Sequence, residues 1–498
     1  MNRFNSIFFF FFLFILAGSF YNLKKSEENL LTKYENIDGT PVVVTKPFEE
    51  NNKGELIILA HGFAGSTSFM RSIAVSLANA GHTTIRFDFL GHGKHKSPFF
   101  GNVRDPNGPS IRFIEQLNTI IDTYKKEYRY SKAILIGHSM ASDIIIRSAN
   151  VRDDIKSVIG ISTYTNETLN KTFPNLLILN GEWEKKLIKK TVEFFKDNGI
   201  NNAKKNVTYG SVKDGVARKM QIIKNSDHVG ILYSSDTQIF IANWLQELGS
   251  SVKVQSNNSI GFWIASAFTS LIFIFILLIR FFPKKSSANF EINKKKLWII
   301  IILSSIFIPF FLQSFKVQFL NYPVHNYVVN YFSLLSLCII FFTPLKFNEK
   351  WLSNFNPISF FWLTFFYIII LGGLLDSYIS SYFLSFGRVT VFLLLTISCM
   401  LFCTVLQIIY ESGKHGWLLA NFLKLNVLIS LSTAIYLNFD ELFLMAYLIL
   451  LFILFGLTFG FLSNLLNKKH HNYLSTGTAN GIVLALTFSS AIPLYYVS

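Results

Sequence analysis

Long apolar stretches in the second half of the chain constrain its fold most strongly. Each is long enough to cross a bilayer core of about 30 Å as a helix. They lie near 260–282, 297–315, 326–345, 358–375, 389–410, 418–439, 442–466 and 475–497. Charged residues crowd into the first half of the chain and become sparse after residue 297. We therefore expect a polar domain followed by an all-α polytopic membrane domain of about eight transmembrane helices over residues 258–498.

The chain also begins with an apolar stretch, "MNRFNSIFFFFFLFILAGSFY", in which Arg3 precedes a run of about 15 apolar residues. Residues 1–22 are therefore a signal peptide or an uncleaved signal anchor. Ala17 and Ser19 have the spacing of small residues that cleavage requires. The run continues through Phe20 and Tyr21, which favours an anchor. A signal peptide and a signal anchor would both direct the residues that follow out of the cytoplasm.

The basic residues between the apolar stretches predict the orientation of the chain. One set of loops is rich in lysine: Lys284, Lys285, Lys294, Lys295, Lys296, Lys346, Lys350, Lys414, Lys468 and Lys469. The opposite short loops carry Lys316 and Arg388 beside Asp376, Asp440 and Glu441. Because positive charge is retained in the cytoplasm, the lysine-rich loops should be cytoplasmic and residues 23–257 extracytoplasmic. We expect an integral protein of the plasma (inner) membrane, in contact with membrane lipids.

The lysines in short loops beside the apolar stretches also explain the formal net charge of +16. A nucleic-acid-binding domain would place its basic residues on one face and carry a recognisable motif, and no such motif is present. We therefore expect no nucleic-acid partner. The oligomeric state is not predicted.

Residues 23–257 have the pattern of an α/β domain. Asp38-Gly39, between two extended stretches, predicts a hairpin. From 55 to 248, apolar stretches of strand length alternate with helical periodicity. The expected strands are "ELIILAHG", "HTTIRFDF", "KAILIG", "SVIGIS", "NLLILNG" and "RKMQIIKN". This alternation predicts a mostly parallel sheet covered on both faces.

A candidate nucleophile follows the third of these strands, in "KAILIGHSMASDII". Ser139 lies between a strand and a helical segment, with Gly137 and Ala141 two residues away on either side. A nucleophile elbow needs small residues at these positions because its turn is tight. The usual pattern ends in Gly, so Ala141 is a mild departure. The alternative is a serine in an ordinary strand–helix turn.

A glycine-bearing loop, "AHGFAGS", follows the first of the expected strands. In such an architecture this loop donates one backbone N–H to an oxyanion hole, and the residue after the nucleophile donates the other. The backbones of Phe63 and Met140 are therefore the candidates. The alternative is a structural loop around His61.

The segments "HGFAGS", "RFDFLGHG" and "GHSMA", in this order and spacing, resemble the α/β-hydrolase superfamily, in particular its esterase, lipase-like and serine-aminopeptidase-like members. The resemblance covers roughly residues 30–248. It implies a doubly wound, mostly parallel sheet, with structural roles for Asp88 and the Gly91–Gly93 turn. His92 and His95 are the only hint of a metal pair, and a structural turn is the better interpretation. No cofactor or metal is expected.

The resemblance also implies a chain order of nucleophile, acid and histidine. The acid should follow "NLLILNG", where Glu184 stands three residues after Gly181 and is the leading candidate. Glu182 is held in reserve, and Asp227 is a weaker alternative. His228, in the loop after the last expected strand, is the candidate base.

The stretch "TYTNETLNKTFPN", where most relatives insert a cap, is too short for a helical lid, so a minimal cap is expected. These features predict a serine hydrolase that cleaves an ester or similar acyl bond of a small-molecule or lipid-like substrate. Two alternatives stay open. One is a serine aminopeptidase acting on exported peptides, and the other is a transport or assembly protein with a non-catalytic hydrolase-fold module.

Overall fold

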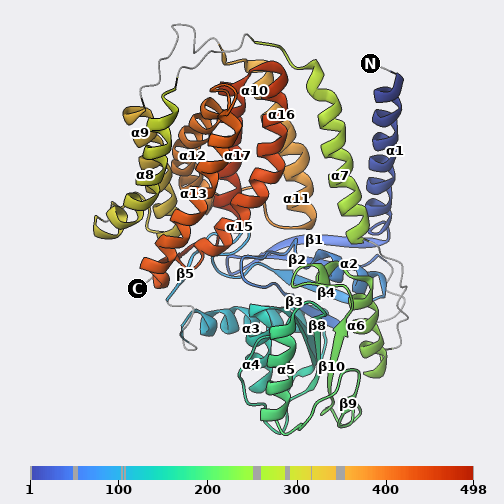
Figure 1. Ribbon diagram of the computed structural model, residues 1–498. Helices are drawn as coiled ribbons and strands as arrows, with labels where there is room; N and C mark the ends of the chain where they lie inside the picture. The colour runs from blue at the N-terminus through green and yellow to red at the C-terminus, as the bar shows by residue number, and fades with distance from the viewer. Residues whose placement is uncertain are drawn as a thin grey trace. The chain divides into compact units, whose positions relative to one another are not determined.

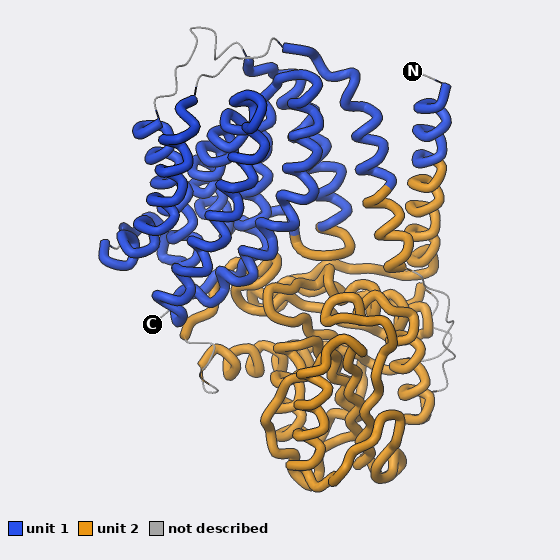
Figure 2. The backbone as a smooth tube through the Cα atoms, in the orientation of Figure 1, with its two compact units in different colours: residues 1–13, 270–375, 382–498 blue, residues 14–269, 376–381 orange. Residues whose placement is uncertain are grey.

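The computed structural model describes residues 3–48, 54–101, 105, 108–250, 260–285, 292–315, 317–343 and 354–496. The chain divides into two compact units (Figure 2). The sheet unit comprises residues 14–269 and 376–381, and the helical unit comprises residues 1–13, 270–375 and 382–498. The predicted boundary at 257/258, and the orientation residues Lys316, Lys346 and Lys350, lie outside the described residues.

Nine strands of the described residues form one sheet in the order β1-β2-β4-β3-β6-β7-β8-β10-β9 (Figure 1). The strands are β1 (Leu30–Ile37), β2 (Thr40–Pro47), β3 (Leu56–Ala60), β4 (Thr83–Phe87), β6 (Ala133–His138), β7 (Ile155–Ile161), β8 (Asn175–Gly181), β9 (Thr208–Tyr209) and β10 (Arg218–Ile223). From β4 to β10 neighbouring strands are parallel, whereas β1, β2 and β9 pair antiparallel at the edges. The hairpin predicted at Asp38-Gly39 joins β1 to β2.

Helices cover both faces of this sheet, as the alternating pattern predicts. They are α2 (Arg71–Asn79), α3 (Pro109–Tyr128), α4 (Met140–Asn150), α5 (Lys185–Asp197) and α6 (Ser235–Glu247). Ile57 and Ile134 of the central strands share one apolar core with Ile73 of α2 and Trp244 of α6. Because successive strand residues point to opposite faces, the buried Ile58 and Leu135 lie on the other face. Helix α4 packs on β6 and β7, and α5 packs on β8. The fold is thus a doubly wound α/β sheet.

No helix interrupts residues 162–174, all described, which join β7 to β8. This agrees with the minimal cap expected from the sequence. The carboxyl ends of the parallel strands therefore carry only short loops at this position.

The second half of the chain is helical. Its main helices are α7 (Ile260–Leu278), α8 (Lys294–Ser314), α9 (Pro323–Phe342), α10 (Pro357–Phe365), α11 (Gly372–Tyr378), α12 (Val389–Tyr410), α13 (Gly416–Leu437), α15 (Met445–Phe455), α16 (Phe461–His470) and α17 (Tyr473–Ala491). A π-helical turn joins α10 to α11, and a second joins α15 to α16.

Eight helices of the described residues are long and apolar enough to cross a membrane. One is α1 (Arg3–Lys25), near the N-terminus, and seven lie between Ile260 and His470. These helices fit a membrane protein. The helix in the predicted stretch near 475–497 is α17, which spans Tyr473–Ala491 and is not among the eight.

Helices α12 and α17 approach each other closely in the helical unit. A Cβ atom placed on Gly477 would lie 2.7 Å from the Thr404 Cα, and one placed on Gly481 would lie 2.3 Å from the Met400 Cα. Small residues spaced by four therefore let these two backbones meet, as is common where helices pack in membranes.

Candidate active site

The turn that carries the candidate nucleophile Ser139 begins where β6 ends. Ser139 has φ 53° and ψ −118°, a combination that non-glycine residues rarely adopt, and α4 starts at the next residue. A Cβ atom on Gly137 would lie 2.7 Å from the Ala141 carbonyl oxygen, and Ala141 is fully buried. Both flanking positions therefore need small residues, which is why alanine can replace the more usual glycine at position 141.

Ser139, His228 and Glu184 are brought together at the carboxyl edge of the sheet. The Ser139 Oγ lies 2.9 Å from the His228 Nε2, and the His228 Nδ1 lies 2.6 Å from the Glu184 Oε1. Each comes from a different strand end, after β6, β10 and β8 in turn. This arrangement can pass a proton from a serine hydroxyl to an imidazole that a carboxylate orients.

The Glu184 carboxylate is fixed by further hydrogen bonds. Its Oε2 accepts from the Gly181 amide at 2.6 Å and from the Ser162 hydroxyl at 2.8 Å. Burial alone would raise the pKa of the Glu184 carboxyl, but the hydrogen bonds that it accepts, above all from His228, lower that pKa below its usual value. Glu184 is therefore ionised at neutral pH.

The other two candidate acids do not contact His228. The Glu182 Oε2 accepts from the Asn225 amide at 3.0 Å. The Asp227 Oδ1 accepts from the amides of Val229 and Gly230, at 3.0 and 2.6 Å. Both carboxylates thus stabilise the turn that presents His228, whereas Glu184 orients its ring.

The backbone of the loop after β3 lies directly against the serine turn. A Cβ atom on Gly62 would lie 2.7 Å from the His138 Nδ1 and 3.0 Å from the Ser139 Cβ, so only glycine fits there. Phe63 follows in this loop, and Met140 begins α4. Amides that approach a nucleophile from a loop and from a helix N-terminus can stabilise an oxyanion.

The other singled-out residues have local roles. The His61 Nε2 accepts from the Phe89 amide at 3.1 Å, and burial lowers the pKa of His61. The Asp88 carboxylate accepts from the amides of Thr67 and Lys94, at 2.7 and 2.8 Å, which ties two loops together.

The two histidines of the possible metal pair also bond to their own turn. The His92 Nδ1 lies 2.8 Å from the Leu90 carbonyl oxygen, and the His95 Nδ1 accepts from the Ser97 amide at 3.1 Å. Among the described residues no group of three or more His, Cys, Asp or Glu side chains is placed to hold a metal ion.

Two contributors to the site were not predicted from the sequence. The His138 Nε2–H donates to the His228 carbonyl oxygen at 2.8 Å, and burial, followed by the nearby His228, lowers the pKa of His138 to about 3. The neutral His138 ring thus holds the histidine loop. The other is Ser162, which bonds to Glu184 from the end of β7. A signal existed for Ser162, because the carboxyl ends of neighbouring parallel strands meet at one sheet edge.

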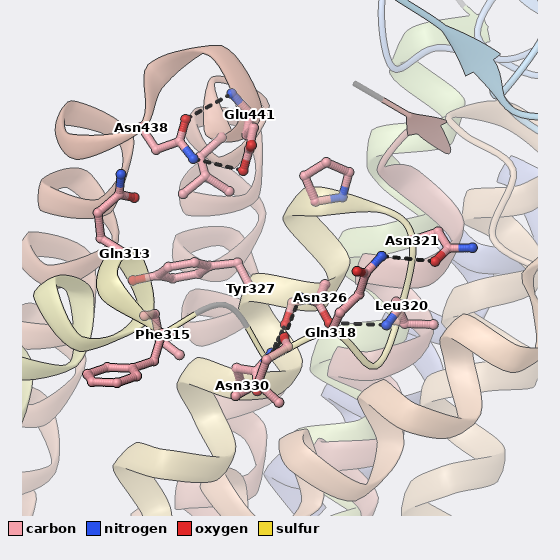
Figure 3. A pocket seen from close by; sticks show the side chains of 14 residues that line it. Gln313, Phe315, Gln318, Leu320, Asn321, Asn326, Tyr327, Asn330, Asn438 and Glu441 are labelled. Carbon is pink, nitrogen blue, oxygen red and sulfur yellow. Dashed lines mark hydrogen bonds between the residues drawn. The ribbon is translucent and has the colours of Figure 1, made fainter. Parts of the chain in front are cut away.

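The helical unit contains a separate polar cavity of about 230 Å³ between α8, α9 and the short helix α14 (Phe439–Leu442). Amide side chains around it bond to one another and to the loop before α9 (Figure 3). The Asn326 Oδ1 accepts from the Leu320 amide at 3.1 Å, and the Asn438 Nδ2 donates to the Glu441 Oε2 at 2.8 Å. None of the predicted site residues lines this cavity.

Residues 51–221 match the protein-family model described as serine aminopeptidase, S33. The match includes Ser139 and Glu184 and ends before His228.

Similar solved structures are α/β hydrolases. A CIB-like hydrolase of Thermoplasma acidophilum is 16% identical with a TM-score of 0.32, over 44% of this chain and 97% of that one. A dienelactone hydrolase of Anabaena variabilis is 14% identical with a TM-score of 0.33, over 44% and 98% of the two chains. The epoxide hydrolase VrEH1 of Vigna radiata is 10% identical with a TM-score of 0.32, over 44% and 99%. In this chain, the sheet topology, the Ser139 turn and the family match together identify the first half as an α/β-hydrolase fold of the serine-hydrolase type.

Proposed function

We propose that this protein is a membrane-bound serine hydrolase that cleaves esters or similar acyl bonds outside the cytoplasm. One observation carries the proposal: the unbroken hydrogen-bonded chain from the Ser139 hydroxyl through His228 to the Glu184 carboxylate. A serine becomes a useful nucleophile when an adjacent base can take its proton and a third group orients that base.

The reaction would proceed in two halves. The His228 Nε2 takes the proton of Ser139 while the serine oxygen attacks the carbonyl carbon of the substrate. The amides of Phe63 and Met140 stabilise the oxyanion that forms. The intermediate collapses to an acyl-serine, and protonated His228 gives its proton to the departing alcohol. In the second half, His228 deprotonates a water molecule, whose attack releases the acid and regenerates Ser139.

The minimal cap and the apolar helices motivate the proposed substrate class. The minimal cap leaves no helical lid between β7 and β8, and the chain carries helices that fit a membrane protein. A substrate with an apolar acyl group, available at a membrane, suits such a protein.

Covalent labelling of the full chain tests this function. A fluorophosphonate probe phosphonylates an activated serine, so membranes containing the wild-type protein should be labelled and those containing Ser139→Ala should not. The matched control is Ser148→Ala, on the same helix as the serine turn, where the hydroxyl bonds to the Asn118 Oδ1 at 2.7 Å. Labelling that persists in Ser139→Ala, or that is absent from the wild-type protein, would remove the basis of the proposal.

The family match favours a second candidate, a serine aminopeptidase acting on exported peptides. Its chemistry at Ser139 would be the same, with an amine as the leaving group. Hydrolysis of p-nitrophenyl esters, compared with amino-acid arylamides, separates the two functions. An esterase should turn over only the esters efficiently, whereas an aminopeptidase should also cleave arylamides that carry a free amino group.

A further inference from the structure

A short piece of the second half of the chain, Asp376–Ser381, belongs to the sheet unit. This 376–381 segment comprises the last turn of α11 and the three residues after it. We propose that it is a positioning element, which holds the loop of Phe63 and the segment after His228 at a fixed spacing. The inference rests on the function proposed above, and it makes catalysis depend on residues far from Ser139 in the sequence.

The first set of contacts is with the loop after β3. The Ser381 amide donates to the Ser66 Oγ at 3.1 Å, and the Ser68 Oγ donates to the Asp376 carbonyl oxygen at 2.5 Å. Ser66 is fully buried, so bulk water does not compete for this hydrogen bond in the structure. The same loop presents Phe63, the candidate oxyanion donor, and it is thus held from one side by the 376–381 segment.

Charged residues strengthen this attachment. The Arg71 Nη1 donates to the Ser377 carbonyl oxygen at 2.8 Å, and the Arg71 guanidinium lies 4.5 Å from the centre of the Tyr378 ring. The Lys94 ammonium lies 2.9 Å from the Asp376 carboxylate. The Arg71 contacts are partly buried, where a hydrogen bond to a charged donor is stronger than one exposed to water.

The second set of contacts is on the side of the histidine. Tyr233 lies five residues after His228, and its hydroxyl donates to the Tyr378 carbonyl oxygen at 2.9 Å. The Phe69 ring bridges the two sides, with its centre 6.3 Å from that of Tyr233 and 5.5 Å from that of His138. His138 in turn donates to the His228 carbonyl oxygen.

The 376–381 segment therefore contacts both the loop of Phe63 and the segment after His228, whose spacing the proposed chemistry requires to stay fixed. Oxyanion donors act only when they already lie at the position that the developing charge will occupy. A shift of the loop relative to His228 should slow the chemical step more than it weakens substrate binding. We thus expect the loss of these contacts to lower kcat and the rate of phosphonylation, with little effect on KM.

Two variants of the full chain, in detergent micelles, remove these contacts singly. Ser68→Ala deletes the hydrogen bond to Asp376, and Tyr233→Phe deletes the one to Tyr378 while keeping the ring. The matched control is Tyr124→Phe, which deletes a tyrosine hydroxyl that donates to the Glu35 Oε2 at 2.5 Å, on the α3 side of the sheet. For each protein, kcat and KM for a p-nitrophenyl ester, the rate of fluorophosphonate labelling and the Tm are measured.

We expect kcat and the labelling rate to fall about 10-fold in Ser68→Ala and Tyr233→Phe, with KM within about 2-fold of wild type. Tyr124→Phe should lower the Tm to a similar extent but keep its kcat. The positioning role is wrong if both site variants keep the wild-type kcat, or if Tyr124→Phe loses as much kcat as they do. If the wild-type chain itself is neither labelled nor active, the proposed function fails, and the positioning role fails with it.

Discussion

At the scale of single residues, Glu184 is the most informative position for testing the proposed site, because its carboxylate accepts hydrogen bonds from His228, Gly181 and Ser162. Glu184→Gln keeps the shape but replaces one oxygen with an NH₂ group, which cannot accept from the His228 Nδ1–H or from the Gly181 amide. If the proposed mechanism holds, kcat for ester hydrolysis should fall about 10³-fold, since the imidazole loses its orientation and its ionic support.

Glu182→Gln is the control for this substitution, because Glu182 lies two residues away and its carboxylate accepts from the Asn225 amide instead of from His228. Its kcat should stay within about 2-fold of wild type, since an amide oxygen can replace the carboxylate oxygen as acceptor. Equal losses in the two variants would argue against Glu184 as the acid.

Two buried histidines should make the stability of the protein sensitive to acid. Burial, followed by Lys156, lowers the pKa of His82 to about 4, and burial, followed by His228, lowers that of His138 to about 3. Both are neutral in the folded protein and gain a proton readily once unfolded. The two neutral histidines contribute fully to the free energy of unfolding above the ordinary histidine pKa of about 6.5. This contribution is lost as the pH falls from there through the lowered pKa values of the folded protein.

Between pH 8 and pH 5 each histidine should therefore remove about 2 kcal/mol from the free energy of unfolding. Thermal unfolding of the full chain, followed by tryptophan fluorescence, should show a Tm that drops over this range. His82→Gln retains an acceptor for the Glu55 amide, which bonds to the His82 Nδ1 at 3.0 Å, and it should reduce the drop. A drop that is unchanged in this variant would contradict the assignment.

The predictability of the site follows from how local each signal is. Ser139, His228 and Glu184 were predicted because each stands just after a strand, and parallel strands bring such positions to one edge. Ser162 stands in the same kind of place, after β7, but the positional signal alone did not single it out as a partner of Glu184 because it belongs to no catalytic motif. His138 was missed because its role depends on a backbone carbonyl ninety positions away, which no spacing pattern encodes.

At the scale of elements, the packing of α12 on α17 gives a sharp test. A methyl group on Gly481 would lie 2.3 Å from the Met400 Cα and 2.6 Å from its amide nitrogen, so the two helices must separate to admit it. Overpacking of this kind costs about 1–3 kcal/mol, and Gly481→Ala should lower the Tm of the full chain in detergent accordingly. Gly456→Ala is the control, because a Cβ atom there meets nothing within 4 Å. A Tm that falls equally in both variants would show that close approach is not the cause.

Several polar residues among the apolar stretches of the helical unit bond to each other, and none of these pairs was predicted from the sequence. The Asn467 Nδ2 donates to the Gln407 Oε1 and to the Thr476 Oγ1, each at 2.7 Å. The Ser463 Oγ donates to the Asn480 Oδ1 at 2.9 Å. Helical periodicity indicates which face of one helix a residue occupies, but it does not indicate which helix lies opposite. Such pairs therefore become visible only in the folded unit.

At the scale of the whole molecule, the expected fold of the first half is confirmed, because alternation of strands and helices carries that information along the sequence. The membership of residues 376–381 in the sheet unit was not predicted. It depends on contacts made far beyond residue 248, where the α/β pattern ends. Long-range packing of this kind is decided by shape and hydrogen bonding in the folded chain, and no local pattern records it.

The predicted topology also belongs to this scale, and cysteine accessibility tests it. All three native cysteines lie in the apolar second half, with Cys399 and Cys403 buried, so the polar domain offers a clean background. Asn201→Cys places a thiol at an exposed position of the sheet unit, and Lys295→Cys places one at an exposed position in the first turn of α8, on the side predicted to be cytoplasmic. If lysine-rich loops are retained inside, a membrane-impermeant maleimide added to intact cells should label Asn201→Cys and spare Lys295→Cys. After the membrane is permeabilised, both should react, and the wild-type chain reports the background from the native thiols. The reverse pattern would place the serine site in the cytoplasm, and its substrates would then have to be sought among cytoplasmic esters.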